Sequence, residues 1–282
     1  MNESVPSQRP GDGLFTHKTP RVVAARRLTT RSGRDRADRF IAEGAQAVRE
    51  AVRRPERVHE IFVTATAADR NAELVAQAAA AGVQVSEITE RAATMLSETV
   101  TPQGILAVCD SLNVPLDQAL GGSPRLVAVL AGIADPGNAG TVLRAADAAG
   151  ADAVVFAGDA VDPHNGKCVR ASTGSLFHLA IARARDLDAV FRACRGAGLR
   201  LVAADGHADH DLSMVRTLAE PTAWVFGNEA HGLDAEVLSG VDEAVRVPLY
   251  GAAESLNLAT AAAVCLYASA MTQHSSRGGN RA

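Results

Sequence analysis

Short apolar runs alternate with helical segments through the second half of this 282-residue sequence, and this alternation restricts the fold more than any other feature. The predicted strands cover residues 126–131, 153–156, 179–181, 199–203, 223–226 and 244–247. The predicted helices cover residues 138–149, 187–197 and 255–271. Continuous apolar strands that alternate with helices are typical of a parallel sheet covered on both faces. We therefore predict an α/β fold that binds its ligand at the carboxyl ends of the strands.

The first half of the sequence predicts a smaller α/β unit. Apolar residues at helical spacing, such as Phe40, Ile41, Ala45 and Val48, predict a helix over residues 40–53. Further predicted elements are strands at residues 58–63, 83–88 and 105–109 and helices at residues 72–81 and 91–97. The predicted organisation is a disordered tail (1–17), a first domain (18–112), a linker (113–123), a second domain (124–274) and a flexible tail (275–282).

Positive charge is concentrated near the N-terminus. The whole chain has a formal net charge of −4, but residues 18–39 contain eight Lys and Arg side chains against two Asp. Lys and Arg release counterions from RNA phosphates, so Arg26, Arg27, Arg31 and Arg34 are candidate RNA-binding residues. A solvated helix face or a basic tail would explain the same charges equally well.

Several classes of protein are disfavoured by the sequence. Its four Cys residues are widely spaced without a CxxC pair, which argues against a zinc site or disulfides and favours a cytoplasmic protein. Residues 256–271 form the most apolar segment but are too short to span a bilayer, so no membrane association is expected. His207 and His210 lack converging ligands, and a solvent loop is a better interpretation than a metal site. The GxGxxG and Walker patterns are missing, which disfavours a dinucleotide- or nucleotide-binding enzyme of another class.

The first unusual strand end follows the predicted strand at residues 126–131. Asn138 is predicted to cap the next helix, and Gly140 would let a partner approach its first turn. Arg144 follows about a turn and a half after Asn138, among apolar neighbours. Arg144 is therefore a candidate functional residue, although a surface Arg that points into solvent is an equally good interpretation.

Two later strand ends carry further candidates. Gly227 follows an apolar strand and Gly232 closes its loop, which frees backbone groups to face a ligand. Between them, Glu229 is either a cap-like acceptor or a functional carboxylate. After the last strand, Ser255 is predicted to open the final helix, and Asn257 is predicted to be a buried amide that ties loops together. Each segment alone is also compatible with an ordinary turn.

In this order, the three segments resemble the SpoU/TrmH family, the ribose 2′-O-methylating branch of the SPOUT methyltransferases. The family pattern NxGxxxR is matched by Asn138, Gly140 and Arg144. The family pattern GNExxGL is matched by Gly227, Asn228, Glu229, Gly232 and Leu233. The third pattern, a Pro and a Gly-containing loop before SLN, is matched by Pro248, Gly251, Ser255, Leu256 and Asn257. The likeness covers residues 124–274, and three ordered motifs are far more specific than one.

Other segments extend this resemblance. Residues 169–179 (VRASTGSLFHL) look like the segment that precedes a strand in the family. In the first half, residues 40–51 (FIAEGAQAVREA) and 101–108 (TPQGILAV) resemble the RNA-binding domain of rRNA-directed members, a fold shared with some ribosomal proteins. Ala230 and His231 replace the Gly-Glu often found in the second motif, and this departure bears on the substrate class.

The resemblance implies a SPOUT domain with a parallel sheet and a deep trefoil knot, assembled as a homodimer with its active site at the interface. It implies that S-adenosylmethionine is held at Gly227, Val247 and Leu256, with Ser255 nearby. The implied reaction transfers a methyl group to a ribose 2′-hydroxyl of RNA. The first domain favours 23S rRNA over tRNA as the substrate.

The resemblance assigns the central catalytic role to Arg144. A guanidinium stays protonated in proteins, so we expect Arg144 to grip the adjacent phosphate and stabilise the developing alkoxide rather than act as a base. Asn138, Glu229 and Asn257 join Arg144 as candidate catalytic residues. Glu229, Ser255 and Asn257 are expected to shape the pocket, and the proton acceptor stays open. Two alternatives are a tRNA 2′-O-methyltransferase and a non-catalytic RNA-binding ribosome-assembly factor.

Overall fold

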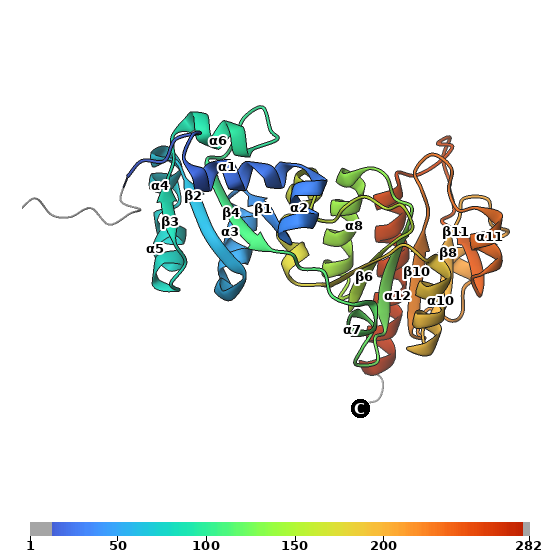
Figure 1. The fold of residues 1–282 in the computed structure, drawn as a ribbon. Helices are drawn as coiled ribbons and strands as arrows, with labels where there is room; N and C mark the ends of the chain where they lie inside the picture. The colour runs from blue at the N-terminus through green and yellow to red at the C-terminus, as the bar shows by residue number, and fades with distance from the viewer. Residues whose placement is uncertain (1–12, 279–282) are drawn as a thin grey trace, which may run out of the picture. The chain divides into compact units, whose positions relative to one another are not determined.

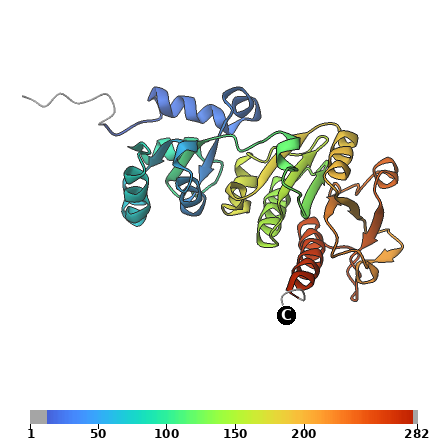
Figure 2. The same ribbon diagram turned by 90° about the horizontal axis from the view of Figure 1, so that it is seen from below.

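The computed structural model describes residues 13–278, which divide into two compact units between Ser111 and Leu112. Each unit has a sheet of its own within the described residues, with four strands in the first unit and seven in the second (Figure 1). The same division is visible after a quarter turn (Figure 2), where the helices of each unit lie against that unit's own strands.

The first unit is built on a mixed sheet with the strand order β1-β4-β2-β3. Its strands are β1 (Arg39–Glu43), β2 (Val58–Val63), β3 (Val85–Glu87) and β4 (Ile105–Asp110). Its helices are α1 (Pro20–Arg26), η1 (Arg27–Thr29), α2 (Arg31–Ala37), α3 (Ala45–Val52), η2 (Pro55–Arg57), α4 (Ala65–Arg70), α5 (Ala72–Ala80) and α6 (Glu90–Leu96). Strand β4 pairs antiparallel with β1 and β2, and β3 pairs parallel with β2.

The predicted helix over residues 40–53 is wrong in its first part. Residues Arg39–Glu43 form strand β1, and the helix α3 begins only at Ala45. Gly44 separates the two elements with a φ of 97°, a conformation that residues with a Cβ rarely adopt. Apolar residues as close together as Phe40 and Ile41 fit a strand and a helix equally well, and pairing with β4 decides between them.

Two helices that the apolar pattern did not reveal precede β1. Helix α1 has Pro20 at its start, where the missing N–H costs no hydrogen bond. Helix α2 is capped by the hydroxyl of Thr30, which accepts the backbone N–H of Gly33 at 3.2 Å. The basic segment is therefore helical and belongs to the folded part of the first unit.

Both predicted tails lie partly outside the described residues, at residues 1–12 and 279–282. Where the tails are described, they are structured, which corrects the prediction. Phe15 forms a parallel bridge with Ile88, and its N–H donates to the carbonyl of Glu87 at 2.8 Å. At the other end, the last helix continues to Gly278.

The second unit confirms the predicted α/β fold with a parallel sheet. Its strands have the order β7-β6-β5-β10-β8-β11-β9, and all six pairings are parallel. The strands are β5 (Leu126–Ala131), β6 (Ala153–Ala157), β7 (Ala180–Ala184), β8 (Arg200–Ala204), β9 (His210–Asp211), β10 (Thr222–Phe226) and β11 (Glu243–Arg246). The helices are α7 (Leu116–Ala119), α8 (Pro136–Ala148), α9 (Gly166–Ser172), η3 (Ser175–Phe177), α10 (Leu187–Gly196), η4 (Leu212–Met214), α11 (Ala235–Ser239) and α12 (Leu258–Gly278).

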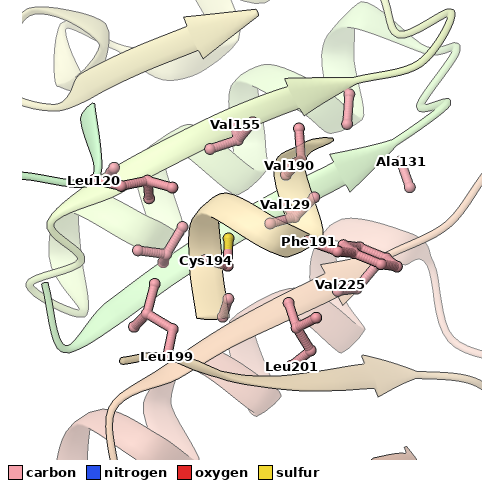
Figure 3. Close-up of a cluster of buried hydrophobic side chains, with 14 of the residues drawn as sticks. Leu120, Val129, Ala131, Val155, Val190, Phe191, Cys194, Leu199, Leu201 and Val225 are labelled. Atoms are coloured by element: carbon pink, nitrogen blue, oxygen red, sulfur yellow. The ribbon is translucent and has the colours of Figure 1, made fainter. Parts of the chain in front are cut away.

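The central strands of the second unit are buried on both faces. Along each strand, alternate side chains point to opposite faces of the sheet. On one face, Val129, Val155 and Val225 pack with Phe191 and Cys194 of α10 (Figure 3). On the other face, α12 and α8 cover β5 and β10. There the indole N–H of the fully buried Trp224 donates to the hydroxyl of Ser269 in α12 at 2.9 Å, which satisfies both polar groups.

Within residues 13–278, no helix combines the length and the apolar character that crossing a bilayer would require.

Candidate active site

The three motif segments converge at the carboxyl ends of the strands in the second unit. Asn138 lies in the first turn of α8, Glu229 lies in the loop after β10, and Asn257 lies just before α12. The amide nitrogen of Asn138 donates to Glu229 Oε1 at 3.1 Å. The amide nitrogen of Asn257 donates to Asn138 Oδ1 at 3.0 Å. Three segments that are distant in the sequence are thus joined by two side-chain hydrogen bonds.

Glu229 accepts hydrogen bonds from the β5–α8 loop as well. Its carboxylate oxygens accept the backbone N–H groups of Ala134 at 3.1 Å and Asp135 at 3.0 Å. Partial burial alone would raise the pKa of this carboxyl group, but the donors from Ala134, Asn138 and Asp135 outweigh it and hold the pKa of Glu229 below its usual value. Glu229 therefore acts as an ionised tie between two loops, in agreement with the cap-like interpretation.

Asn257 differs from its prediction in two respects. It is exposed rather than buried, and the final helix begins at Leu258, so Ser255 does not open it. The side-chain oxygen of Asn257 accepts the N–H of Ala259 at 2.9 Å, as a helix N-cap does. The predicted tie between loops is present, because the other end of the same amide contacts Asn138.

Helix α8 is capped by Asp135 rather than by Asn138. The Asp135 carboxylate accepts the N–H of Asn138 at 2.8 Å and lies 2.6 Å from the ammonium of Lys167. The hydrogen bond from Lys167, followed by that from Asn138, lowers the pKa of Asp135. Sequence analysis missed both Asp135 and Lys167, although an Asp directly before Pro136 is a common helix start.

Gly140 serves helix packing and not the approach of a ligand. A Cβ at this position would lie 2.3 Å from the carbonyl oxygen of Cys168 and 2.6 Å from the Cβ of Ala171, both in α9. Such distances are far below van der Waals contact, so only glycine lets α8 and α9 approach this closely. The partner that the sequence predicted for Gly140 is thus another helix of the same unit.

A cavity of about 1190 Å³ lies beside these three ties. The loops that follow β8, β10 and β11 and the start of α12 supply its walls. Val247, Ser255 and Leu256, three of the predicted cofactor-binding residues, line it together with Asn138, Glu229 and Asn257. Gly227 does not line it: a Cβ there would lie 2.4 Å from the carbonyl oxygen of Gly232, so Gly227 permits the tight turn of the loop itself.

The lining of the cavity suits a ligand that combines an apolar group with positive charge. Apolar walls come from residues such as Leu233, Leu249 and Leu256. Its charged lining comprises four carboxylates, on Asp205, Asp211, Glu229 and Glu254, against one guanidinium, on Arg246. Arg246 is itself paired with Asp211 at 2.6 Å. Such a site attracts a cation and offers no cradle for phosphates.

Arg144 does not join this group within one copy of the chain. Its side chain is exposed on α8, it is absent from the cavity wall, and it forms no hydrogen bond or ion pair with another described residue. An offset of six positions from Asn138 turns a helix by about 240° and advances it by about 9 Å, which explains the separation. The conspicuous guanidinium therefore points away from its own cavity.

The predicted RNA-binding arginines fall into two groups. Arg26, Arg27 and Arg31 are exposed on the helices that precede β1. Arg34 is 6% exposed, and its guanidinium donates to the carbonyls of Leu28 at 3.0 Å and Thr29 at 3.2 Å. A guanidinium engaged in this way stabilises the turn before α2, a structural role that the sequence did not predict for Arg34.

His207 and His210 do not form a metal pair with other ligands. His207 lines the cavity, whereas His210 begins the edge strand β9. Across residues 13–278, no group of three or more His, Cys, Asp or Glu side chains is arranged to hold a metal ion.

The fold and the site together define an α/β methyltransferase domain preceded by a smaller domain, and family comparisons agree. Residues 125–267 match the model of the SpoU rRNA methylase family, and residues 19–107 match that of the MRM3-like substrate-binding domain. The chain belongs to the SpoU rRNA methylase family.

Named relatives and solved structures match three quarters or more of the chain. A 23S rRNA (guanosine(2553)-2′-O)-methyltransferase, RlmP of Bacillus subtilis, is 35% identical over 89% of this chain and 96% of its own length. A 23S rRNA (guanosine-2′-O-)-methyltransferase, RlmB of Bordetella pertussis, is 33% identical over 76% of this chain and 89% of its own. An AdoMet-bound rRNA methyltransferase from Sinorhizobium meliloti superposes with a TM-score of 0.77 at 28% identity and covers 91% of this chain and 97% of that one. The SpoU methyltransferase AviRb from Streptomyces viridochromogenes, in complex with the cofactor AdoMet, gives a TM-score of 0.78 at 28% identity and covers 91% and 100%.

Proposed function

We propose that this protein transfers a methyl group from S-adenosylmethionine to a ribose 2′-hydroxyl of 23S rRNA. The observation that carries the proposal is the convergence of Asn138, Glu229 and Asn257 on one cavity with an acidic and apolar lining. The names of the relatives and the AdoMet-bound neighbours support the substrate and the cofactor.

The cavity fits S-adenosylmethionine by size and by charge. That cofactor has an apolar adenine face, a sulfonium cation and no phosphate, which matches a site rich in carboxylates. Val247 and Leu256 would contact the adenine, and the backbone near Ser255 would orient it. Glu229 and Asn138 hold the loops in place so that the site needs little rearrangement when it is filled. When bound, the cofactor supplies an electrophilic methyl group.

Arg144 serves the cavity of a second copy of the chain in this proposal. The guanidinium grips the phosphate next to the target ribose and stabilises the alkoxide that develops as the hydroxyl loses its proton. Val264, Tyr267 and Met271 support a homodimer, because they form a stripe on α12 that is 39%, 40% and 62% exposed. The hydroxyl of Tyr267 reaches the carbonyl of Ala148 at the end of α8, which joins this stripe to the helix that carries Arg144.

The remaining parts of the proposal concern architecture. Strand β11 lies beyond β8 and β10, yet the helix that follows it packs against α8 and β5. Residues 247–257 must therefore return across the carboxyl ends of the strands, which supports a trefoil knot.

The first unit binds RNA through Arg26, Arg27 and Arg31 and shares the fold of a ribosomal protein. The protein acts in the cytoplasm, where its substrate is made.

Methyl transfer in vitro tests the proposal directly. The purified protein, labelled S-adenosylmethionine and unmodified 23S rRNA transcript are incubated, and the labelled nucleoside is identified after nuclease digestion. We expect a 2′-O-methylated nucleoside. A label on a base, or transfer to tRNA but not to 23S rRNA, would contradict the reaction or the substrate. Failure to bind S-adenosylmethionine in calorimetry would favour a non-catalytic assembly factor.

Mixed dimers test whether Arg144 acts across the interface. Arg144→Ala leaves the cavity intact, whereas Leu256→Arg blocks the cavity but keeps Arg144. We expect each variant alone to be inactive, and the co-expressed pair to recover part of the activity because one of its two sites is complete. No recovery in dimers purified through two different tags would mean that Arg144 acts within its own copy or not at all.

A further inference from the structure

Tyr250 is the most exposed aromatic residue among the large hydrophobic side chains at the surface. Its side chain is 92% exposed, whereas Trp224 and the phenylalanines of both cores are buried. It forms no hydrogen bond or ring contact with another described residue, yet it lines the cavity of the candidate active site. A tyrosine ring is mostly apolar surface, so leaving it in water forgoes the stabilisation that burial gives. An exposed ring among the lining residues of an open cavity is available to contact a ligand.

The apolar residues that line the cavity differ in exposure. Val247 is half-buried where the chain leaves β11, Leu256 is 37% exposed, and Tyr250 is almost completely exposed in the loop between them. The half-buried part of this series suits the adenine of the proposed cofactor. Tyr250 is the most exposed of the three, so its ring is accessible to a second molecule.

The volume of the cavity leaves space for that second molecule. Pockets for one small ligand typically measure about 300–1,000 Å³. This cavity measures about 1190 Å³ and is open to solvent. A 2′-hydroxyl that reaches a methyl group inside it must bring its own ribose, and the base attached to that ribose then lies within a few ångströms of the rim.

We propose that Tyr250 is a stacking platform for the nucleobase of the nucleotide that is methylated. The inference rests on the proposed function and deepens it by naming a residue that positions the RNA. Sequence-specific RNA recognition targets single-stranded loops, bulges and ends, whose unstacked bases are commonly stacked on aromatic side chains. Stacking accepts any base, because each base has a π-face, so Tyr250 positions the nucleotide without selecting its identity.

Kinetics of Tyr250→Ala and Tyr250→Phe test the proposal in the full-length protein. With unmodified 23S rRNA transcript, we expect Tyr250→Ala to raise the KM for RNA about ten-fold or more, with little change in S-adenosylmethionine affinity measured by calorimetry. Tyr250→Phe keeps the ring and should restore the KM. Met214→Ala is the matched control, because Met214 is 72% exposed in the same unit but lies outside the cavity.

Other outcomes would overturn the proposal. A weaker affinity of Tyr250→Ala for S-adenosylmethionine, with an unchanged KM for RNA, would mean that the ring covers the cofactor. A change in molecular mass by light scattering would mean that Tyr250 contacts the second copy. Unchanged kinetics would mean that the ring has no role in substrate positioning.

Photocrosslinking separates this proposal from the proposed function. Ultraviolet irradiation of the protein with the same transcript should attach RNA to the peptide that contains Tyr250, and Met214→Ala should preserve this product. If the wild-type protein forms the crosslink but transfers no methyl group, the proposed function fails and the stacking contact stands. If it transfers the methyl group but never crosslinks at Tyr250, the stacking contact fails alone.

Discussion

One carboxylate of the second unit and two guanidinium groups of the first unit are held in opposite ways. In the second unit, the Glu229 carboxylate accepts two backbone N–H groups and the amide of Asn138, so its position is fixed. In the first unit, Arg26 and Arg27 are exposed and have no ion pair with another described residue. A fixed carboxylate preorganises a small cavity, whereas free guanidinium groups can follow a flexible polyanion. The difference teaches that the geometry of the cavity and the proposed attraction of RNA depend on different residues, so substitutions can test them separately.

The largest expected effect is a loss of stability in the second unit alone. Gly140→Val places methyl groups against the backbone of α9, where even a Cβ would lie 2.3 Å from a carbonyl oxygen. We expect the free energy of unfolding of the second unit to fall by about 3 kcal/mol, as in other overpacked interiors. Urea denaturation measures this loss. Gly196→Ala is the control, because a Cβ at Gly196 in α10 would meet no atom within 4 Å.

Neutralising the exposed arginines that precede β1 should affect the first unit alone. Changing Arg26, Arg27 and Arg31 together to Gln should weaken binding of 23S rRNA transcript by about 100-fold at low salt and reduce the slope of log K against log salt by about 2. S-adenosylmethionine affinity should not change. Arg192→Gln removes an exposed arginine of the second unit and is the matched control. An unchanged salt slope in filter binding would show that these arginines do not face RNA.

Lowering the pH should remove the stabilisation that the ionised Glu229 gives to the second unit. Its folded pKa lies below the ordinary value of 4.5, so its ionised form stabilises the folded state above about pH 4.5. This contribution is lost as the pH falls through the lower folded pKa. We expect Glu229→Gln to cost about 1 kcal/mol of unfolding free energy at pH 7, and the difference from wild type to shrink below pH 4.5. Glu254→Gln is the control, because Glu254 lines the same cavity but forms no hydrogen bond with other described residues. If the difference in unfolding free energy between wild type and Glu229→Gln stays constant with pH, the ionised carboxylate of Glu229 does not stabilise the fold.

The smallest expected effect is an absence of reaction at the cysteines. All four are buried, and burial raises the pKa of Cys194 to about 11 and that of Cys265 to about 12, so little thiolate exists at neutral pH. We expect no labelling by a thiol reagent in the folded protein. With rising urea, Cys109 reports opening of the first unit and the other three cysteines report the second. Rapid labelling of the native protein would contradict the burial of these thiols.

The sequence predicted the fully apolar strands of the second unit better than the first strand of the first unit. Strands such as Leu126–Ala131 are apolar along their whole length, and such runs are readily recognised. In the first unit, the spacing of Phe40 and Ile41 predicts a helix, because a strand of five residues is too short for its alternation of side chains to be recognised. The decisive interaction is the pairing of β1 with β4, which no local pattern contains.

The sequence predicted which residues belong to the candidate site but not how they contact one another. Three motifs identified Asn138, Glu229 and Asn257, and the structure joins them by hydrogen bonds. The same motifs also contain glycines that serve the fold. Gly140 and Gly227 allow close backbone contacts and do not make room for a ligand. Such contacts depend on which elements meet in space, and sequence spacing does not state that. The sequence did not predict a role for Lys167, because its partner Asp135 lies in a distant segment of the chain.

The order of strands in the second unit has a consequence for its synthesis. Leu126 of β5 pairs with Thr222 of β10, so the middle of this sheet cannot close until the intervening chain has been made. At ordinary translation rates this interval lasts about 5 to 20 seconds. Throughout that time β5 presents an apolar edge without its second neighbour, a state that invites association with other nascent chains. The edge of β5 that pairs with β10 must therefore stay protected until residues 222–226 have been made.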